Sequence, residues 1–530
     1  MTRRRLLLAL GYWLSLVALL APVWLFAYFP STDGPSHLFN AYVFANYSRV
    51  PLFQQIFLLH VPSAGNLTGH ALAIFLLKIG VPGEICEKLI ATLAIAALAL
   101  AFRYAVTAFS SVSALAPFLV FPFLYNWPMQ MGFWSFSLGV PFLFISVGLY
   151  FRYRGRWRPS SFLYLLLAAA CAYLSHPIAW AVSALVIALL ALGIEGPQLR
   201  FPYSRKRALV EILVPLAAFL PFALPNFLFA AKSSYLEWQH VSSLAKWLWP
   251  LYTDSPVHLF PADAHAARLL FLVIVLGSCA HFLSKLRRRN LAIADVLLPA
   301  ALVLLGLGLI SPVRIGEGTF IQVRLLLFGF LLCLVWLGAT LPPRALAPAA
   351  ALALLFTAWL ILVRLPAWRT TNREIAAFVQ LARIIPANAL ICQIDFIPQS
   401  ETVLPLKHVA DLLPAENFVD VRDYEAGRSM FWTRFRPGYF FDENFRYLSG
   451  DRNFEGALDR FEQRTGKHVD YIVLTEFQHA PPAALRAELP ERYNEYQLVS
   501  GQLPWLAIYK RSSAPLRLQT AGNAHPSSRS

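Results

Sequence analysis

Phe29-Pro30-Ser31-Thr32-Asp33-Gly34-Pro35-Ser36-His37 follows directly on the first long hydrophobic run of the chain, which predicts that it lies at a membrane surface. The stretch places a carboxylate, Asp33, and an imidazole, His37, four residues apart. Gly34 and Pro35 disfavour an undisturbed helix through the acid, so we expect Asp33 to cap a helix that begins near Pro35. A carboxylate at the N-terminus of a helix beside lipid could serve as a structural cap or as a catalytic base. The rest of the sequence is needed to decide between these two roles.

The composition is that of a polytopic membrane protein. Of the 530 residues, 58% are hydrophobic and only 14% are charged, which excludes an ordinary soluble enzyme. The formal net charge of +16 would suit nucleic acid, but the basic residues cluster in short loops between apolar runs. There they act as topology signals and as contacts for anionic lipid. Membrane lipids are therefore predicted partners, and nucleic acid is not.

The cysteines and the amino terminus add no chemical motif. The five cysteines form no Cys-x-x-Cys pair, so they predict neither a zinc site nor a redox motif. Arg3-Arg4-Arg5 precedes about 24 apolar residues, a run too long for the core of a signal peptide. We therefore expect an uncleaved first membrane span.

Apolar runs of about 18 residues or more predict ten membrane spans. A shorter run at 113–125 is needed to keep the topology consistent, which gives an all-α membrane domain of about eleven spans over 1–365. The predicted long spans are 6–29, 84–108, 131–151, 160–175, 177–194, 208–230, 266–284, 291–311, 321–340 and 344–365.

The basic residues orient these spans. After Arg3 to Arg5, clusters of Arg and Lys recur in alternate loops, at 152–158, 200–207 and 285–289. Because such residues concentrate on the cytoplasmic side, the amino terminus is predicted to be cytoplasmic and the chain after 365 to lie outside. The predicted outer segments are the long first loop 30–83 and the loops 126–131, 231–265 and 311–318.

Residues 366–511 change character and predict a small extracytoplasmic α/β domain. Helical periodicity covers 372–385. Strand patterns follow it at 389–395, 470–474, 496–499 and 505–509. Residues 512–530 show no pattern and are expected to form a disordered tail.

Asp33, His37 and His176 are the candidate catalytic residues. Asp33 and His37 are either a helix cap with an interfacial histidine or a base with its helper, and a loop of roughly fifty residues after the first span favours the second interpretation. His176 ends an apolar run just before Pro177. It is either interfacial or faces a cavity shared with Asp33.

Arg324 is the candidate phosphate ligand. It lies a few residues inside an apolar run at the outer leaflet, where a charge costs a few kcal/mol unless it is paired or snorkels. A phosphate of a lipid carrier would be a natural partner, because a guanidinium binds phosphate through two parallel hydrogen bonds. Snorkelling, or a pair with Glu317 or Asp33, is the alternative. Arg314 and Lys232 are weaker candidates for the same phosphate.

Trp238, His240 and Tyr252 belong to an outer loop rich in aromatic and polar residues. Aromatic residues at this depth normally anchor spans at the membrane interface. Sugar rings also stack on aromatic faces, so these three residues are candidates for binding the acceptor or the sugar.

This layout resembles the GT-C glycosyltransferases, polytopic enzymes that use polyprenyl-phosphate sugars and include mannosyl- and arabinosyltransferases. The resemblance rests on a cytoplasmic amino terminus, on Asp33 in a long first outer loop, on about eleven spans and on an external carboxy-terminal domain. It implies that Asp33 is a base or a metal-associated acid and that Arg324 binds the donor phosphate. Many members carry a second acid nearby, whereas Gly34 follows Asp33 here and the loop 126–131 has no carboxylate. A divalent cation, Mg²⁺ or Mn²⁺, is therefore less favoured than a metal-independent base, and no residue is assigned as a metal ligand.

The predicted function is transfer of a hexose or pentose from a polyprenyl-phosphate carrier to a hydroxyl of a glycan, lipid or protein, at the outer face of a bacterial inner membrane. A transporter or flippase of a lipid-linked glycan is the main rival; it would show charges at mid-bilayer and internal symmetry. A non-catalytic envelope protein that binds partners through 366–511 is the second rival. Donor sugar and acceptor stay open at this stage.

Overall fold

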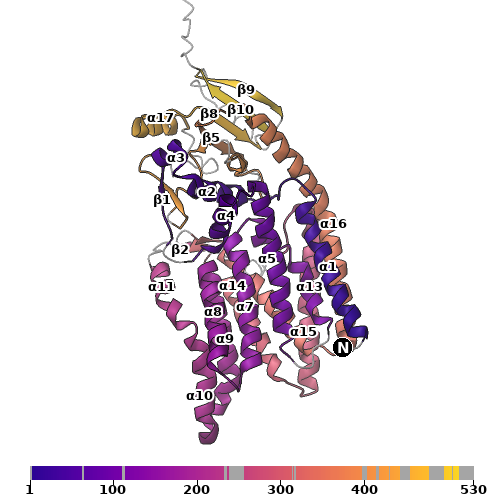
Figure 1. Cartoon of the computed structure of the whole chain (residues 1–530). Coiled ribbons are helices and arrows are strands. Elements are labelled where there is room, and N and C mark those ends of the chain that lie inside the picture. The colour runs from indigo at the N-terminus through magenta and orange to yellow at the C-terminus, as the bar shows by residue number, and fades with distance from the viewer. Residues whose placement is uncertain are drawn as a thin grey trace, which may run out of the picture.

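The computed structural model describes residues 3–62, 65–109, 114–231, 236–237, 256–312, 314–315, 318–396, 403–413, 417–428, 430–441, 454–476, 495–503 and 505–512. A long helical bundle forms one end of the molecule and a mixed sheet forms the other (Figure 1). The helices of the loop 30–83, which is the predicted first outer loop, lie between these two parts, and the amino terminus lies at the end of the bundle far from the sheet (Figure 1).

Eight helices of the described residues are long and apolar enough to cross a membrane. A ninth span forms if α10 (Pro202–Ala217) and α11 (Leu220–Ala231), which are bent by 48° at their junction, are counted together. The prediction of an integral, multi-pass, mostly helical protein is confirmed. The eight helices are α1 (Arg3–Trp24), α5 (Gly83–Val106), α7 (Trp134–Tyr153), α9 (Pro177–Glu195), α13 (Ala264–Arg287), α14 (Leu297–Ile310), α15 (Ile321–Thr340) and α16 (Pro343–Ala382).

The predicted count of about eleven exceeds this number for two reasons. The helix predicted at 160–175 is α8 (Pro159–Ser175), which at 17 residues is a short apolar helix. The run predicted at 113–125 contains the short 3₁₀ helix η1 (Ala116–Phe123), and α6 (Trp127–Gln130) follows it.

The segment around η1 still carries the chain from one end of the bundle to the other. Arg152 donates a hydrogen bond to the carbonyl of Tyr104 at one end, and the Asp33 N–H donates to the carbonyl of Met131 at the other. Pro117 and Pro122 remove two backbone donors, which prevents a regular α-helix. Irregular backbone is tolerated at this depth because every residue of η1 is buried within the protein.

The first outer loop folds against the carboxy-terminal part of the chain. Its strand β1 (Phe57–Leu59) pairs antiparallel with β7 (Thr433–Phe435), with Phe57 opposite Phe435. Phe39, Phe53 and Phe57 are fully buried in one core with residues of the distant sheet. The other elements of the loop are α2 (Gly34–Asn46), α3 (Pro51–Ile56) and α4 (Thr68–Lys78).

The carboxy-terminal part contains a five-stranded sheet of order β6-β5-β8-β10-β9. The strands β6, β5 and β8 are parallel, and β10 is antiparallel to both β8 and β9. The predicted small α/β domain is thus present, although the expected boundary at 365/366 falls inside α16. The elements are β5 (Leu390–Asp395), η5 (Val409–Leu412), β6 (Val419–Asp420), α17 (Phe454–Thr465), β8 (Tyr471–Thr475), β9 (Tyr496–Leu503) and β10 (Leu506–Arg511).

The remaining described elements are short. Three two-residue strands form a small sheet in the order β2-β3-β4 near the end of the bundle that faces the five-stranded sheet (Figure 1). The short elements are η2 (Gly196–Arg200), β2 (Leu236–Glu237), η3 (Pro261–Asp263), η4 (Ile293–Val296), β3 (Arg314–Ile315) and β4 (Gly318–Thr319).

Candidate functional site

Asp33 occupies the N-cap position of α2, as the sequence predicts, but its side chain makes no capping hydrogen bond. The Ser31 hydroxyl accepts the Gly34 N–H instead, at 3.1 Å. Asp33, which is 8% exposed, lines a cavity. The structural-cap interpretation is therefore wrong for its side chain, although it holds for its position in the chain.

Backbone contacts fix the position of Asp33. The Asp33 N–H donates to the carbonyl of Met131 at 2.9 Å. Gly132 follows with φ +83°, and a Cβ added to it would lie 2.5 Å from the Gly34 nitrogen. Only glycine combines this positive φ with so close an approach to another backbone. The chain after η1 thus forms a rigid support under Asp33.

The cavity brings together four residues that the sequence analysis selected. It encloses about 300 Å³ and is lined by Asp33, His37, His176 and Arg324. These residues come from α2, from the junction of α8 and α9, and from α15. Charged and titratable side chains from distant parts of the chain therefore converge on one space.

Arg324 is buried on one wall of this cavity, with its guanidinium carbon 4.3 Å from the centre of the Phe133 ring. Such a contact with an aromatic face stabilises the cation. One terminal nitrogen lies 2.8 Å from His176 Nε2. The Arg324 Nε is buried and finds no hydrogen-bond partner among the described residues. A guanidinium with a spare, desolvated donor is suited to binding an anion.

Burial dominates the electrostatics of Asp33 and raises the pKa of its carboxyl above the usual value. Lys407 opposes this effect most strongly, followed by a hydrogen bond from Tyr424 and by the charges of Arg428 and Arg324. His408 Nε2 lies 3.7 Å from Asp33 Oδ1. Burial holds the pKa of His408 well below its ordinary value, so this imidazole is neutral.

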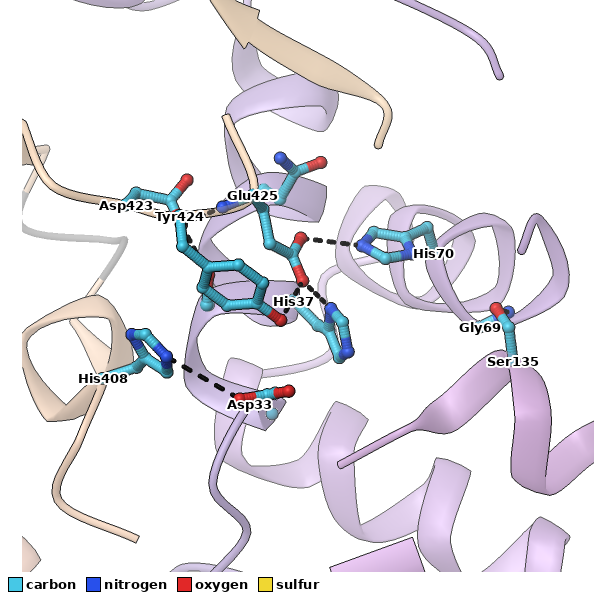
Figure 2. A network of polar contacts seen from close by, with 12 residues as sticks. Asp33, His37, Gly69, His70, Ser135, His408, Asp423, Tyr424 and Glu425 are labelled. Carbon is cyan, nitrogen blue, oxygen red and sulfur yellow. Dashed lines mark hydrogen bonds and ion pairs between the residues drawn. The ribbon is translucent and has the colours of Figure 1, made fainter. Parts of the chain in front are cut away.

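The roof of the site comes from the carboxy-terminal part of the chain. Tyr424 and Glu425, in the turn after β6, point toward α2 (Figure 2). Glu425 Oε2 lies 3.0 Å from His70 Nε2, and Glu425 Oε1 contacts His37 Nδ1. Burial lowers the pKa of His70 to about 3 and holds the pKa of His37 well below its usual range. Both imidazoles are therefore neutral beside a buried carboxylate.

Five of these residues were not predicted from the sequence. Tyr424, Glu425, Arg428 and His408 lie in the segments that were read only as part of a small external domain, and His70 lies in α4. A signal was present in the dense charges of Asp420 to Arg428, which follow no helical or strand period.

His37, His70 and Glu425 are also the described residues that could hold a metal. One ligand atom from each lies within 4.8 Å of the others. His37 thus belongs both to the cavity lining and to this cluster.

Comparison of the whole chain with known proteins gives structural neighbours only. No protein-family model matches the chain, and no curated protein matches it in sequence. The cryo-EM structure of the arabinofuranosyltransferase AftD from Mycobacteria matches 97% of this chain at 15% identity with a TM-score of 0.50. The chain has the fold of the GT-C glycosyltransferases. This chain spans 40% of the length of AftD.

A second similar structure is that of ArnT from Cupriavidus metallidurans in the apo state. It matches 94% of this chain and 98% of its own length, at 13% identity and a TM-score of 0.47.

Of the other predicted site residues, the structure describes Arg314 alone. It lies on β3 and is not among the residues that line the cavity, whereas its neighbour Ile315 is. The remaining candidates lie outside the described residues; they are Lys232, Trp238, His240 and Tyr252. Phosphate binding by Lys232 and sugar binding by the last three stay predictions.

Proposed function

We propose that this protein transfers a sugar from a lipid-phosphate carrier to an acceptor hydroxyl at the outer face of the membrane. The observation that carries the proposal is the single cavity lined by both Asp33 and Arg324. One is a buried carboxylate suited to accept a proton, and the other is a buried cation with a spare donor suited to a phosphate. The GT-C fold supports the same reaction class.

The proposed reaction is a direct displacement. The acceptor oxygen attacks the anomeric carbon while Asp33 takes the hydroxyl proton. The bond from the anomeric carbon to the phosphate oxygen breaks, and its electron pair leaves with the polyprenyl phosphate. Arg324 stabilises the negative charge that develops there, and His176 orients the guanidinium from 2.8 Å. A single displacement inverts the configuration at the anomeric carbon.

The raised pKa of Asp33 suits this role, because a general base is most effective when its pKa lies near the working pH. His37, one helical turn from Asp33, also lines the cavity and would help to orient the acceptor. The family resemblance also allows a divalent cation, Mg²⁺ or Mn²⁺, that Asp33 would hold and that would neutralise phosphate charge, but the lack of a second acid beside Asp33 favours the metal-independent base. The acceptor class (glycan, lipid or protein) is left open by the proposal.

The test is sugar transfer by the purified full chain in lipid vesicles, with a panel of polyprenyl-phosphate hexoses and pentoses as donors. Asp33→Asn and Arg324→Ala should each lower turnover by about 100-fold or more, since each removes a group acting in the transition state. Asp459→Asn on α17 and Arg383→Ala, exposed at the end of α16, are matched controls that should retain the parental rate.

Two outcomes would reject the proposal. One is transfer at the parental rate by correctly inserted Asp33→Asn and Arg324→Ala variants. The other is movement of the intact lipid-linked sugar across the vesicle membrane without transfer, which would favour the flippase alternative.

A further inference from the structure

Three buried side chains converge beside the cavity from three separate segments. His37 comes from α2, His70 from α4 and Glu425 from the turn after β6 (Figure 2). Their exposures are 5%, 1% and 0%. Glu425 uses one oxygen toward each imidazole, at 3.0 Å for His70 Nε2. Two nitrogens and one carboxylate thus point at a common centre.

The donor set fits a particular class of cation. Mg²⁺ and Ca²⁺ prefer shells made of oxygen atoms alone. Two imidazoles and one carboxylate instead form a set that Zn²⁺ commonly takes, with its fourth position left to water or substrate. The ligand atoms lie within 4.8 Å of one another, which a tetrahedral centre of this kind requires.

The outer contacts of His37 also fit a metal ligand. A histidine that binds a metal usually donates its other N–H to a carbonyl or carboxylate. The His37 ring makes a hydrogen bond to the backbone of Gly132. Because a neutral imidazole has only one N–H, a ring that donates it to Gly132 presents a lone pair to Glu425. A lone pair facing a carboxylate is repelled unless a proton or a metal ion is bound there, and the donor set described above fits a metal ion.

One buried nitrogen of the cluster is unsatisfied. His37 Nδ1, which faces Glu425, finds no hydrogen-bond partner among the described residues. A buried carboxylate is costly unless a positive charge or several hydrogen bonds compensate it. A divalent ion at the common centre would supply that charge.

We propose that His37, His70 and Glu425 bind one Zn²⁺ ion. The ion joins the first outer loop, which supplies both histidines, to the carboxy-terminal part, which supplies the carboxylate. Since His37 lies one turn from Asp33 on α2, the ion also fixes the start of that helix. The site is therefore a positioning site for the cavity, and its occupancy does not depend on the proposed sugar transfer.

The test measures metal content in the purified full chain carrying no affinity histidines. The protein is stripped with a chelator, dialysed separately against Zn²⁺, Mn²⁺ and Mg²⁺, and analysed by mass spectrometry of the bound metal. We expect one Zn²⁺ per chain and a higher Tm after loading. His70→Ala and Glu425→Gln should each lose most of this zinc, because each removes one of three ligands, and loss of even an outer-shell partner lowers metal affinity by about 10- to 100-fold.

His468→Ala is the matched control, because His468 also pairs with a glutamate, Glu462, at 2.9 Å but lies outside the cluster. It should retain one Zn²⁺ per chain. X-ray absorption at the zinc edge of the parent protein needs no variant and should show two imidazoles per ion. Less than stoichiometric zinc in the parent, zinc retained by both ligand variants, or a shell without two imidazoles would each overturn the proposal.

Discussion

Asp33 is buried, and the positive charges around it limit how far its pKa rises. Lys407 is the strongest of these, and it is not among the residues that line the cavity. Transfer requires the ionised carboxylate, so the rate should fall as the pH drops through the pKa of Asp33. In Lys407→Gln the loss of a positive charge raises that pKa further, and the acidic limb should move to higher pH with little change in the plateau rate.

A pH profile of kcat/KM measures this shift. Lys467→Gln is the control, since Lys467 bonds Gln55 and is not among the charges acting on Asp33. An acidic limb that stays in place in Lys407→Gln would mean that a group other than Asp33 limits the rate at low pH.

The variant Arg324→Lys tests whether phosphate binding needs the paired hydrogen bonds of a guanidinium or only a positive charge. In Arg324→Lys the positive charge remains but the paired hydrogen bonds are lost. Charge-assisted hydrogen bonds are worth about 1.5–3 kcal/mol, so kcat/KM for the lipid-phosphate donor should fall by about 10- to 100-fold. Arg383→Lys at the exposed end of α16 is the control. Parental kcat/KM in Arg324→Lys would show that a point charge is sufficient.

At the residue scale, the sequence was most informative where a polar residue interrupts an apolar run. Asp33, His176 and Arg324 each stand at the outer end of such a run, and the structure brings them together. Glu425 and His70 could not be found in this way, because no periodicity marks them. They are 355 residues apart in the sequence and meet only through tertiary packing.

Among the elements, the turn at Gly132 that follows α6 controls the position of Asp33. In Gly132→Ala the new Cβ meets the Gly34 nitrogen, and the residue must also keep φ +83°. The left-handed backbone alone costs about 1–2 kcal/mol, and the clash adds to it by displacing α2. Both Tm and the transfer rate should therefore fall.

Gly80→Ala separates these two effects. Gly80 has φ +88°, but a Cβ there meets nothing within 4 Å. This variant should lose some stability and keep its transfer rate. Equal loss of activity in Gly132→Ala and Gly80→Ala would mean that Gly132 does not maintain the position of α2.

The segment around η1 shows why hydrophobicity alone does not give the number of membrane-spanning helices. Hydrophobicity correctly indicates that the chain crosses the bundle between α5 and α7, but it does not report whether the crossing is helical. Pro117 and Pro122 break the helix, and burial against α5, α15 and α16 makes the irregular backbone acceptable. That burial depends partly on α15 and α16, which come about 200 residues later in the chain, far beyond the windows of about 11 to 18 residues over which local patterns act.

At the scale of the whole molecule, the first outer loop and the carboxy-terminal part form one unit. The strand pairing of β1 with β7 and a shared core join them, although about 370 residues separate them in sequence. Four of the five strands in the carboxy-terminal sheet were predictable from their own patterns, and the two-residue strand β6 was not. The pairing of the carboxy-terminal part with the loop was not predictable, because β1 is only three residues long and its partner β7 has no distinctive pattern.

A buried hydrogen bond across this union provides a test of its contribution to stability. The Asn40 side chain of α2 donates to the Thr433 hydroxyl of β7 at 2.6 Å, and both residues are fully buried. Thr433→Val removes the acceptor and leaves the Asn40 amide unsatisfied, which should cost about 1–3 kcal/mol. We expect a lower Tm in detergent and faster limited proteolysis within residues 34–62.

A double-mutant cycle separates this pair from general damage to the fold. Asn40→Leu combined with Thr433→Val leaves no unsatisfied partner, so the double variant should lose less than the sum of the two single losses. Thr465→Val is the matched control: its hydroxyl donates to the Phe461 carbonyl within α17, away from the union, and its loss should leave the proteolysis pattern unchanged. Additive losses in the cycle, or the same proteolysis in the control, would show that the Asn40–Thr433 bond does not hold the loop to the carboxy-terminal part.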